Sequence, residues 1–119
     1  MDLHAFIREY TDAVYHQRDP GAASRYIADP CIRHEHGHRI VMSLAENTAR
    51  IAGFLERATD LRFENAATVA EGELYATAFQ FSFVSDGAAQ TLSGIEVFRV
   101  SDGKIVETWN SAAGAGPWG

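Results

Sequence analysis

A single glutamate stands among apolar neighbours in a segment whose pattern is typical of a strand. Glu96 follows Ile95 and precedes Val97 and Phe98. A carboxylate without a partner is costly to ionise in apolar surroundings, so burial raises its pKa. Such a carboxyl can donate a hydrogen bond or act as an acid near neutral pH. Glu96 is therefore the first candidate for a catalytic residue. The alternative is a structural pairing with an arginine or histidine beside a pocket.

Three histidines, His34, His36 and His38, fall within five residues. On a strand His34 and His36 share one face and Glu35 points to the other. A His-x-His pair can bind a metal, but the spacing offers no clear third ligand, and the next acid, Glu46, belongs to a capping box. We therefore expect no metal. His34 is expected in the pocket, where a neutral imidazole accepts a proton near pH 7, with His36 and His38 at its mouth or in solvent. A hydrogen-bonded structural histidine is the alternative for His34.

Tyr10, Tyr15 and Tyr26 fall in segments with helical periodicity. Tyr10 belongs to the apolar stripe of the first segment, so its ring is expected to face the sheet and its hydroxyl needs a partner. Tyr15 lies off that stripe. Core packing is the default for all three, and a pocket hydroxyl from Tyr10 is the alternative.

Other motifs that carry chemistry are missing from the sequence. It contains no G-x-S-x-G nucleophile elbow, and the glycines near Pro117 do not open a helix as a phosphate-binding loop does. Cys31 is expected to be a small buried hydrophobe. Trp118 is expected to cover the pocket or the edge of a dimer, with a frayed terminus as the alternative.

Helices that position these residues are expected in the first half of the chain. Apolar residues recur at helical spacing over residues 2–18, with Asp2 as the N-cap. Asp19-Pro20 begins a second, short helix that Asp29-Pro30 ends. Short strands follow over residues 31–36 and 39–42. Ser43 and Glu46 then form a capping box that opens a helix of about four turns, as the apolar spacing up to Ala58 indicates.

The second half changes to a period of two, which predicts strands. From Leu61 to Val69 the odd-numbered residues share a face, and from Tyr75 to Phe83 aromatic side chains do the same. Asp86-Gly87 and Asp102-Gly103 are hairpin signals that separate strands over residues 91–100 and 104–110. Helices on one face of a strongly curved antiparallel sheet give an α+β cone with an interior, so we predict one domain over residues 1–119.

Length and composition limit the classes of protein that remain. The chain has 119 residues, 46% of them hydrophobic and 22% charged, with a net charge of −6 and one cysteine. An acidic chain with scattered basic residues does not have the electrostatic pattern of a nucleic-acid-binding or anionic-membrane protein. One cysteine cannot form an internal disulfide. The sequence shows no signal peptide and no apolar run of membrane-spanning length, so we expect a cytoplasmic protein.

Two segments resemble the nuclear-transport-factor-2-like superfamily, and most of all its SnoaL-like branch. The first runs from Asp19-Pro20 to Ile32-Arg33-His34. The second, G-I-E-V-F-R-V followed by D-G-K-I-V-E-T-W-N, covers residues 94–100 and 102–110 and has the form of a frequent ending in that branch. The resemblance implies a cystatin-like α+β barrel fold that holds a ligand between helices and a concave sheet. The superfamily also includes members without catalysis, so fold does not settle function.

The resemblance also implies roles for single residues. Glu96 matches the carboxylic acid in the oxyanion hole of steroid isomerases, and His34 matches their general base. Tyr10 or Tyr15 matches their oxyanion tyrosine. Asn110 stands where SnoaL-like cyclases have an acid/base aspartate; an asparagine cannot shuttle a proton, but in scytalone-dehydratase-like members it positions substrate. Phe98 and Thr108 complete the expected substrate-binding set with Tyr10 and Asn110. The acids of the epoxide hydrolase branch are not matched around Arg99.

The sequence therefore predicts a cofactor-independent isomerase, dehydratase or cyclase that acts by proton transfer on a hydrophobic small molecule. His34 would be the base and Glu96 the acid. The alternative is a non-catalytic binding or dimerisation module, and a metal-dependent enzyme ranks third. The aromatic residues Tyr75, Phe79, Phe81 and Phe83 are expected in the core or an interface. Because an exposed aromatic sheet face exceeds what a monomer tolerates, and the outer face commonly forms dimers in this superfamily, we predict a homodimer.

Overall fold

The computed structural model describes residues 1–111 and 113–119. In chain order its elements are α1 (Leu3–Thr11), η1 (Asp12–His16), η2 (Pro20–Arg25), β1 (Ile27–Glu35), β2 (His38–Met42), α2 (Leu44–Arg57), β3 (Thr59–Glu71), β4 (Leu74–Ser85), β5 (Ala88–Ser101), β6 (Lys104–Asn110) and β7 (Gly114–Ala115). No helix in the described part of the chain is long and apolar enough to span a membrane.

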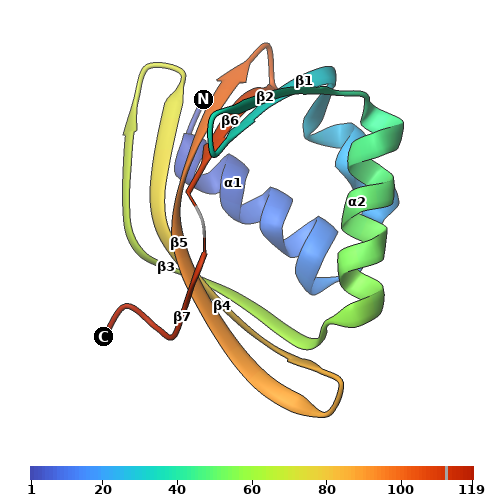
Figure 1. Ribbon diagram of the computed structural model, residues 1–119. Helices are drawn as coiled ribbons and strands as arrows, with labels where there is room; N and C mark the ends of the chain where they lie inside the picture. Colours follow the sequence, from blue (N-terminus) through green and yellow to red (C-terminus); the bar gives the residue numbers. More distant parts are fainter. Residues whose placement is uncertain (112) are drawn as a thin grey trace.

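One curved sheet carries the whole fold. Its strands lie in the order β2-β1-β6-β5-β4-β3, with β7 paired to β5. β1 and β6 are parallel, and the other pairs are antiparallel. Figure 1 shows α1 on the concave side of the sheet and α2 on the far side of that interior. The α+β class with helices on a strongly curved sheet is confirmed, although the sheet is not closed into a barrel.

Local signals set the ends of both α-helices. The Asp2 side chain accepts a hydrogen bond from the Ala5 backbone N–H at 3.1 Å, which caps α1 as expected. Ser43 and Glu46 form the predicted capping box at the start of α2. At the other end of α2, the guanidinium of Arg18 donates to the Leu55 and Ala58 carbonyls, and this contact joins α2 to the end of η1.

The second helix ends earlier than predicted. It is a 3₁₀ turn over Pro20–Arg25, and Asp29-Pro30 lies inside strand β1. The reason is tertiary: the Ile105 N–H donates to the Tyr26 carbonyl at 2.7 Å, and Ile27 pairs with Ile105 of β6. The chain therefore leaves the helix to join the sheet before the proline is reached.

The strand β3 contains an irregularity that the alternating pattern does not reveal. Asn65 pairs with Phe79, but Ala67 pairs with Ala78, so Ala66 is an extra residue in β3. Beyond it the faces exchange, and Val69 is 68% exposed on the outer side, contrary to the prediction.

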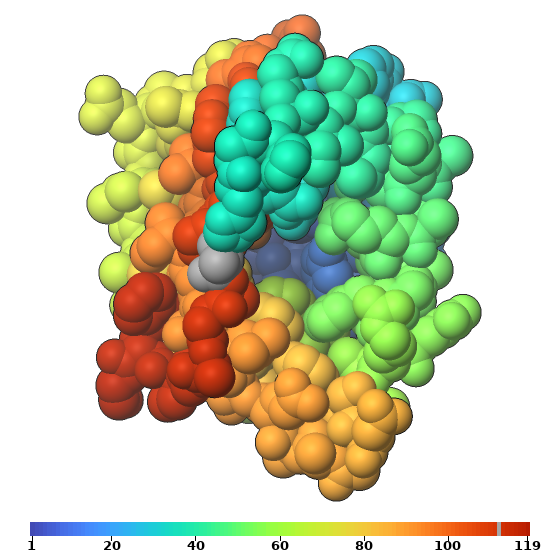
Figure 2. All heavy atoms as spheres, in the orientation of Figure 1, coloured from blue at the N-terminus to red at the C-terminus, as the bar shows by residue number. Residues whose placement is uncertain are grey.

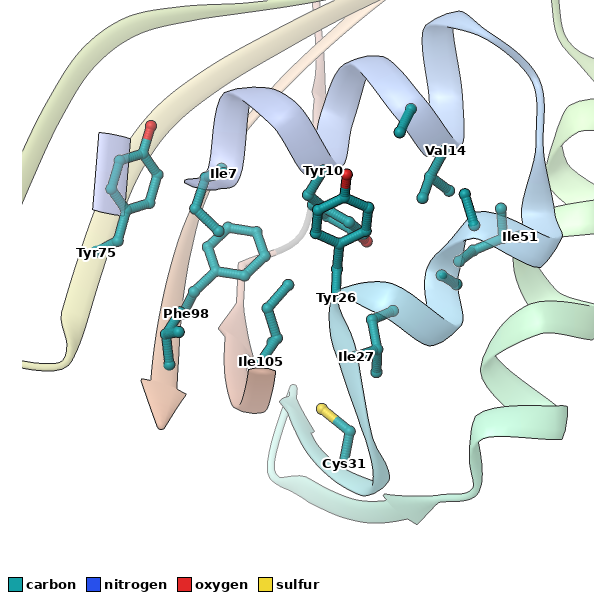
Figure 3. Packing of buried hydrophobic residues seen from close by; sticks show 14 of the residues in the cluster. Ile7, Tyr10, Val14, Tyr26, Ile27, Cys31, Ile51, Tyr75, Phe98 and Ile105 are labelled. Carbon is teal, nitrogen blue, oxygen red and sulfur yellow. The ribbon is translucent and has the colours of Figure 1, made fainter. Parts of the chain in front are cut away.

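The hydrophobic core lies between α1, η2, α2 and the sheet. Figure 3 shows Ile7 and Tyr10 of α1 packed against Phe98, Ile105 and Tyr26. Cys31 is buried there as expected, and burial raises the pKa of its thiol. The remainder of the interior is not filled by side chains.

Candidate functional site

A cavity of about 470 Å³ occupies the interior between the sheet and the helices. This volume lies within the range of small-molecule sites. In Figure 2 the opening is a hollow between the β1–β2 hairpin, α2 and the β4–β5 hairpin, with α1 visible at its floor. Its aromatic walls come from three strands and three helical segments: Tyr10, Tyr15, Phe54, Phe63, Phe79, Phe81 and Phe98.

A row of polar side chains crosses the concave face of the sheet at one level. Glu35 of β1 pairs with Asn110 of β6, Asn110 with Glu96 of β5, and Glu96 with Thr77 of β4. Paired residues in a sheet point to the same side, so all four face the cavity, whose lining includes each of them. The Thr77 hydroxyl donates to Asn65 Oδ1 of β3 at 2.7 Å, which extends the row to a fifth strand.

Glu96 is the acid at the centre of this row. Within residues 1–111 and 113–119 its carboxyl group forms no hydrogen bond and no ion pair within 4 Å. Burial raises its pKa to about 7, although Arg33 and Arg50 act in the opposite direction. Near neutral pH the group therefore populates both protonation states, which suits an acid or a base.

A π-helical turn brings a second tyrosine into the cavity. In η1 the Gln17 N–H donates to the Asp12 carbonyl and the Asp19 N–H to the Val14 carbonyl, five residues back in each case. Residues five apart thereby come to the same side, and the rings of Tyr10 and Tyr15 meet edge to face at 5.9 Å. In an uninterrupted α-helix they would differ in direction by about 140°. Burial, with Tyr15 nearby, keeps the pKa of Tyr10 well above 10.

Two arginines of the cavity wall act electrostatically on Glu96. Arg33 of β1 pairs with Glu35 at 3.1 Å. Arg50 of α2 donates to Asn47 Oδ1 from Nε at 3.4 Å and from Nη2 at 3.1 Å. Burial lowers the pKa of Arg50, but Tyr15, Tyr10 and Glu96 raise it by more, so its guanidinium stays charged.

Five of the six residues expected in the pocket lie in the cavity wall. They are Glu96, Tyr10, Asn110, Phe98 and Thr108. The Asn110 amide donates to the Thr108 hydroxyl at 3.1 Å, so these two hold each other in place. Their positions agree with the expectation, and their roles remain predictions.

The sixth, His34, lies on the opposite face of the sheet, so its predicted place in the cavity is wrong. It pairs in register with Trp109 of β6, and the two rings stack at 5.2 Å with an interplanar angle of 8°. His34 Nε2 is 2.6 Å from Glu107 Oε2, and Arg99 donates to Glu107 Oε1. The His34 hydrogen bond, followed by Arg99, lowers the pKa of Glu107. The structural alternative for His34 fits this geometry.

The alternation of side chains along β1 explains why His34 was expected on the wrong face of the sheet. Buried Cys31 points inward, so the period of two directs Arg33 and Glu35 to the cavity and His34 away from it. The predicted burial of Cys31 was the available signal. Tyr15 depended on the π-helical turn, and Arg50 with Asn47 carried no sequence signal for a cavity.

The other expectations for the histidines and the tail can be compared with the fold. His36 lines the cavity from an exposed turn, and His38 is exposed and pairs with Glu35 at the end of the β1–β2 hairpin. No group of three His, Cys, Asp or Glu side chains among the described residues is arranged to hold a metal. The Trp118 indole donates to the Phe79 carbonyl at 2.8 Å, so it is held against β4 and does not line the cavity.

The aromatic residues of β4 lie on the concave side of the sheet. Phe79 and Phe81 line the cavity, Phe83 packs on Phe54, and Tyr75 is buried against Phe98. Of the four, Tyr75 belongs to the hydrophobic core, as expected, and the other three are only partly buried. The outer face is occupied instead by other apolar side chains, so an exposed aromatic row on β4 is not a reason for a dimer.

Comparisons with known proteins agree with this architecture. The model of the SnoaL-like domain matches residues 7–108. Among solved structures, a SnoaL-like polyketide cyclase from Agrobacterium tumefaciens strain C58 superposes with a TM-score of 0.80 at 16% identity, over 96% of this chain and 92% of that one. No curated protein is similar enough in sequence to count as a match.

Other solved structures with this fold have different activities or ligands. An LEH-like epoxide hydrolase from Mycobacterium tuberculosis has a TM-score of 0.71 at 15% identity, over 87% of this chain and 73% of that one. A protein with a ketosteroid isomerase-like fold from Catenulispora acidiphila, in complex with trimethylamine, has a TM-score of 0.71 at 8% identity, over 88% and 82%. At these identities the similarity shows the fold alone.

Proposed function

Because this chain belongs to the SnoaL-like domain family, we propose that its cavity binds a hydrophobic, cyclic small molecule on which Glu96 moves a proton. The reaction class is isomerisation, dehydration or cyclisation without a cofactor. One observation carries this proposal. Glu96 presents a carboxyl group with a pKa of about 7 to a cavity of about 470 Å³. Among the described residues, this carboxyl group has no hydrogen bond and no ion pair within 4 Å.

Glu96 and Tyr10 have different roles in the proposed proton transfer. The carboxylate form of Glu96 takes a proton from a carbon next to a carbonyl group, and the C–H electron pair forms a C=C bond while the carbonyl oxygen becomes an oxyanion. Tyr10, which burial keeps protonated, donates a hydrogen bond to that oxygen. The protonated Glu96 returns the proton to another carbon, which isomerises the substrate, or to a departing hydroxyl, which dehydrates it.

Asn110 acts as a positioning residue beside Glu96. The two are direct partners across β5 and β6, and both line the cavity. The Asn110 amide is fixed by its hydrogen bond to Thr108, so its carbonyl oxygen has a defined direction from which to accept a substrate hydroxyl. His34 has no part in this mechanism, because it lies on the outer face.

Exchange of carbon-bound hydrogen for deuterium tests the proposal without knowledge of the natural substrate. The probe is 2-tetralone, a bicyclic ketone with exchangeable protons next to its carbonyl, followed by NMR in D₂O. The wild type should accelerate the exchange with saturation, and Glu96→Gln should lose about 10²–10⁴-fold of that acceleration. Glu71→Gln, the same change at an exposed position of β3, is the control and should retain it.

The outcome separates an enzyme from a binding module. If the wild type binds the ketone, as measured by calorimetry, but does not accelerate exchange, proton transfer by Glu96 is wrong and the non-catalytic alternative takes its place. Equal acceleration by Glu96→Gln and the wild type would assign the chemistry to another group.

The outer face of the sheet supports a homodimer as the assembled form. It carries apolar side chains that the fold leaves uncovered, among them Ile95 and Trp109, which are 42% and 37% exposed. In the register of the sheet, Trp109 pairs with Val97, Val97 with Ala76, and Ala76 with Val69, so these side chains form one row across the outer face. An apolar sheet face of this kind is typical of an interaction surface. A second copy of this chain is the occupant we propose.

A further inference from the structure

The guanidinium of Arg50 stands in the cavity wall without a carboxylate partner among the described residues. Its contacts are with neutral groups: the Asn47 amide oxygen and the hydroxyl of Tyr15. The two donations to Asn47 use two of its five N–H groups. A partly buried cation that lacks a counter-ion is costly, because desolvation is not offset by an opposite charge.

The other charged groups of the cavity do not neutralise Arg50. Glu35 forms an ion pair with Arg33, so the charges of these two residues offset each other. Glu96 is the remaining acid of the polar row, and it approaches neither arginine within 4 Å. Asp12, at the end of α1, pairs with His16 at 2.7 Å. Arg8 also lines the cavity without an ion pair, but it is exposed to solvent. Arg50 is therefore the one partly buried arginine of the cavity wall, within the described chain, whose ion-pairing capacity is unused.

We propose that the ligand of this cavity carries a carboxylate group, which binds Arg50, on a cyclic apolar body. The inference rests on the proposed function, since it specifies the molecule on which Glu96 acts. A carboxylate matches the planar guanidinium fork with two parallel hydrogen bonds. The Tyr15 hydroxyl accepts from Arg50 and also shares a hydrogen bond with the Tyr10 hydroxyl, so the guanidinium is held in place beside the two tyrosines.

The surroundings of Arg50 determine where the body of the ligand lies. Phe54 is one helical turn along α2 from Arg50, and its ring meets Phe81 and Phe83 of β4. Phe63 stacks on Phe81 at 5.0 Å and contacts Tyr15. Phe54, Phe63 and Phe81 line the same cavity as Arg50, so an anion held at Arg50 places an attached ring against aromatic surfaces.

The sign of the charge distinguishes this ligand from a neutral ketone or phenol. A neutral molecule leaves the Arg50 cation without a counter-ion, and a cation adds to the positive charge already present. A carboxylate brings one negative charge, to which the N–H groups of Arg50 that Asn47 does not use can donate. The reacting carbon of the same molecule then faces Glu96 on the sheet wall.

Paired probes of one shape test the charge requirement directly. Naphthalene-2-carboxylate and naphthalene-2-carboxamide differ in charge but hardly in size, and isothermal titration calorimetry gives the Kd of each. We expect the wild type to bind the carboxylate at least tenfold more tightly than the amide. Arg50→Gln should remove that preference and leave the Kd of the amide within about twofold. Arg57→Gln, an exposed arginine of the same helix, makes the same change in net charge and should keep the preference.

Three results would overturn the inference, and they differ in what they say of the proposed function. Equal Kd values for carboxylate and amide on the wild type, or a preference that survives Arg50→Gln, refute the carboxylate and leave proton transfer by Glu96 standing. Binding of neither probe refutes the carboxylate and an apolar cyclic ligand together. Conversely, an Arg50-dependent preference, together with 2-tetralone that binds but shows no Glu96-dependent exchange, supports the carboxylate and refutes the proton transfer.

Discussion

Glu96 and His34 lie on opposite faces of one sheet. Glu96 faces the cavity beside Asn110, whereas His34 stacks on Trp109 and binds Glu107 on the outer surface. The sheet thus separates an interior with an unpaired acid from an exterior with a compact ion cluster of Glu107, His34 and Arg99. The proposed ligand chemistry uses the first face, and the proposed homodimer uses the second.

Adjacent residues of β1 should therefore respond differently to the same substitution. Arg33→Gln changes the cavity wall and leaves Glu35 without its ion pair, so we expect the affinity for naphthalene-2-carboxylate to change severalfold. His34→Gln removes the Trp109 stack and the Glu107 contact outside the cavity, so the affinity should stay within about twofold. Calorimetry on both variants measures this. A larger effect at His34 than at Arg33 would contradict the assignment of faces.

The stability of the fold should fall as Glu96 loses its proton. Its native pKa of about 7 lies above the ordinary value of 4.5, so the native state holds the proton more tightly than the unfolded chain. The contribution is fully present below pH 4.5, declines between pH 4.5 and 7, and is absent above that window. The size of this change is about 3 kcal/mol.

Glu96→Gln isolates that contribution because glutamine does not titrate. Urea unfolding at pH 5 and pH 8.5 should show that the free energy of unfolding of the variant, relative to the wild type, is higher at pH 8.5 than at pH 5. A difference that is the same at both pH values would show that the carboxyl group titrates normally in the folded protein.

Gly94 should be intolerant of a larger side chain. It pairs with Phe79, and a Cβ at this position would lie 2.9 Å from Phe79 Cζ and 3.2 Å from Ser111 Oγ. Gly94→Ala therefore forces the Phe79 ring toward the cavity. We expect a loss of about 1–3 kcal/mol in the free energy of unfolding and weaker ligand binding.

The matched control for Gly94 is a glycine with open space around it. A Cβ at Gly114 of β7 meets nothing within 4 Å. Gly114→Ala should leave both the unfolding free energy, measured with urea, and the Kd of the naphthalene probe close to wild-type values. Equal effects of the two substitutions would rule out the Phe79 contact as the cause.

A charge on the outer face should dissociate the proposed homodimer. Ile95 is exposed next to Trp109, so Ile95→Glu places a carboxylate in the apolar surface that two copies would share. Sedimentation velocity at micromolar concentration should show a wild-type dimer and a monomeric variant. Ala45→Glu, an exposed position in the first turn of α2, carries the same charge and should remain dimeric. A wild-type protein that is monomeric at micromolar concentration would refute the proposed homodimer.

Much of the architecture could be predicted from local signals. The N-cap at Asp2, the capping box of Ser43 and Glu46, and the positive-φ hairpin turns at Asp86-Gly87 and Asp102-Gly103 appear as expected. These features depend on residues within a few positions of each other, so the sequence contains the information in full. The places of Glu96 and Asn110 in the cavity wall agree with those that the resemblance of residues 94–110 to the SnoaL-like branch implied.

What local signals did not determine was which face some side chains occupy. Alternation groups His34 with His36 but does not say which set points inward; the pairing of β1 with β6 and the burial of Cys31 decide this. The extra residue Ala66 reverses the faces of β3, and the π-helical turn brings Tyr15 into the cavity.

By itself, then, the sequence determined the fold class, the order of helices and strands, and the acid at Glu96, because caps, turns and periodicity are properties of neighbouring residues. Only the tertiary structure placed Arg33, Arg50 and Tyr15 around that acid and moved His34 to the outer surface. Strand register, bulges and helix winding result from contacts between segments far apart in the chain, and a shift of one residue exchanges the inner and outer faces of a strand.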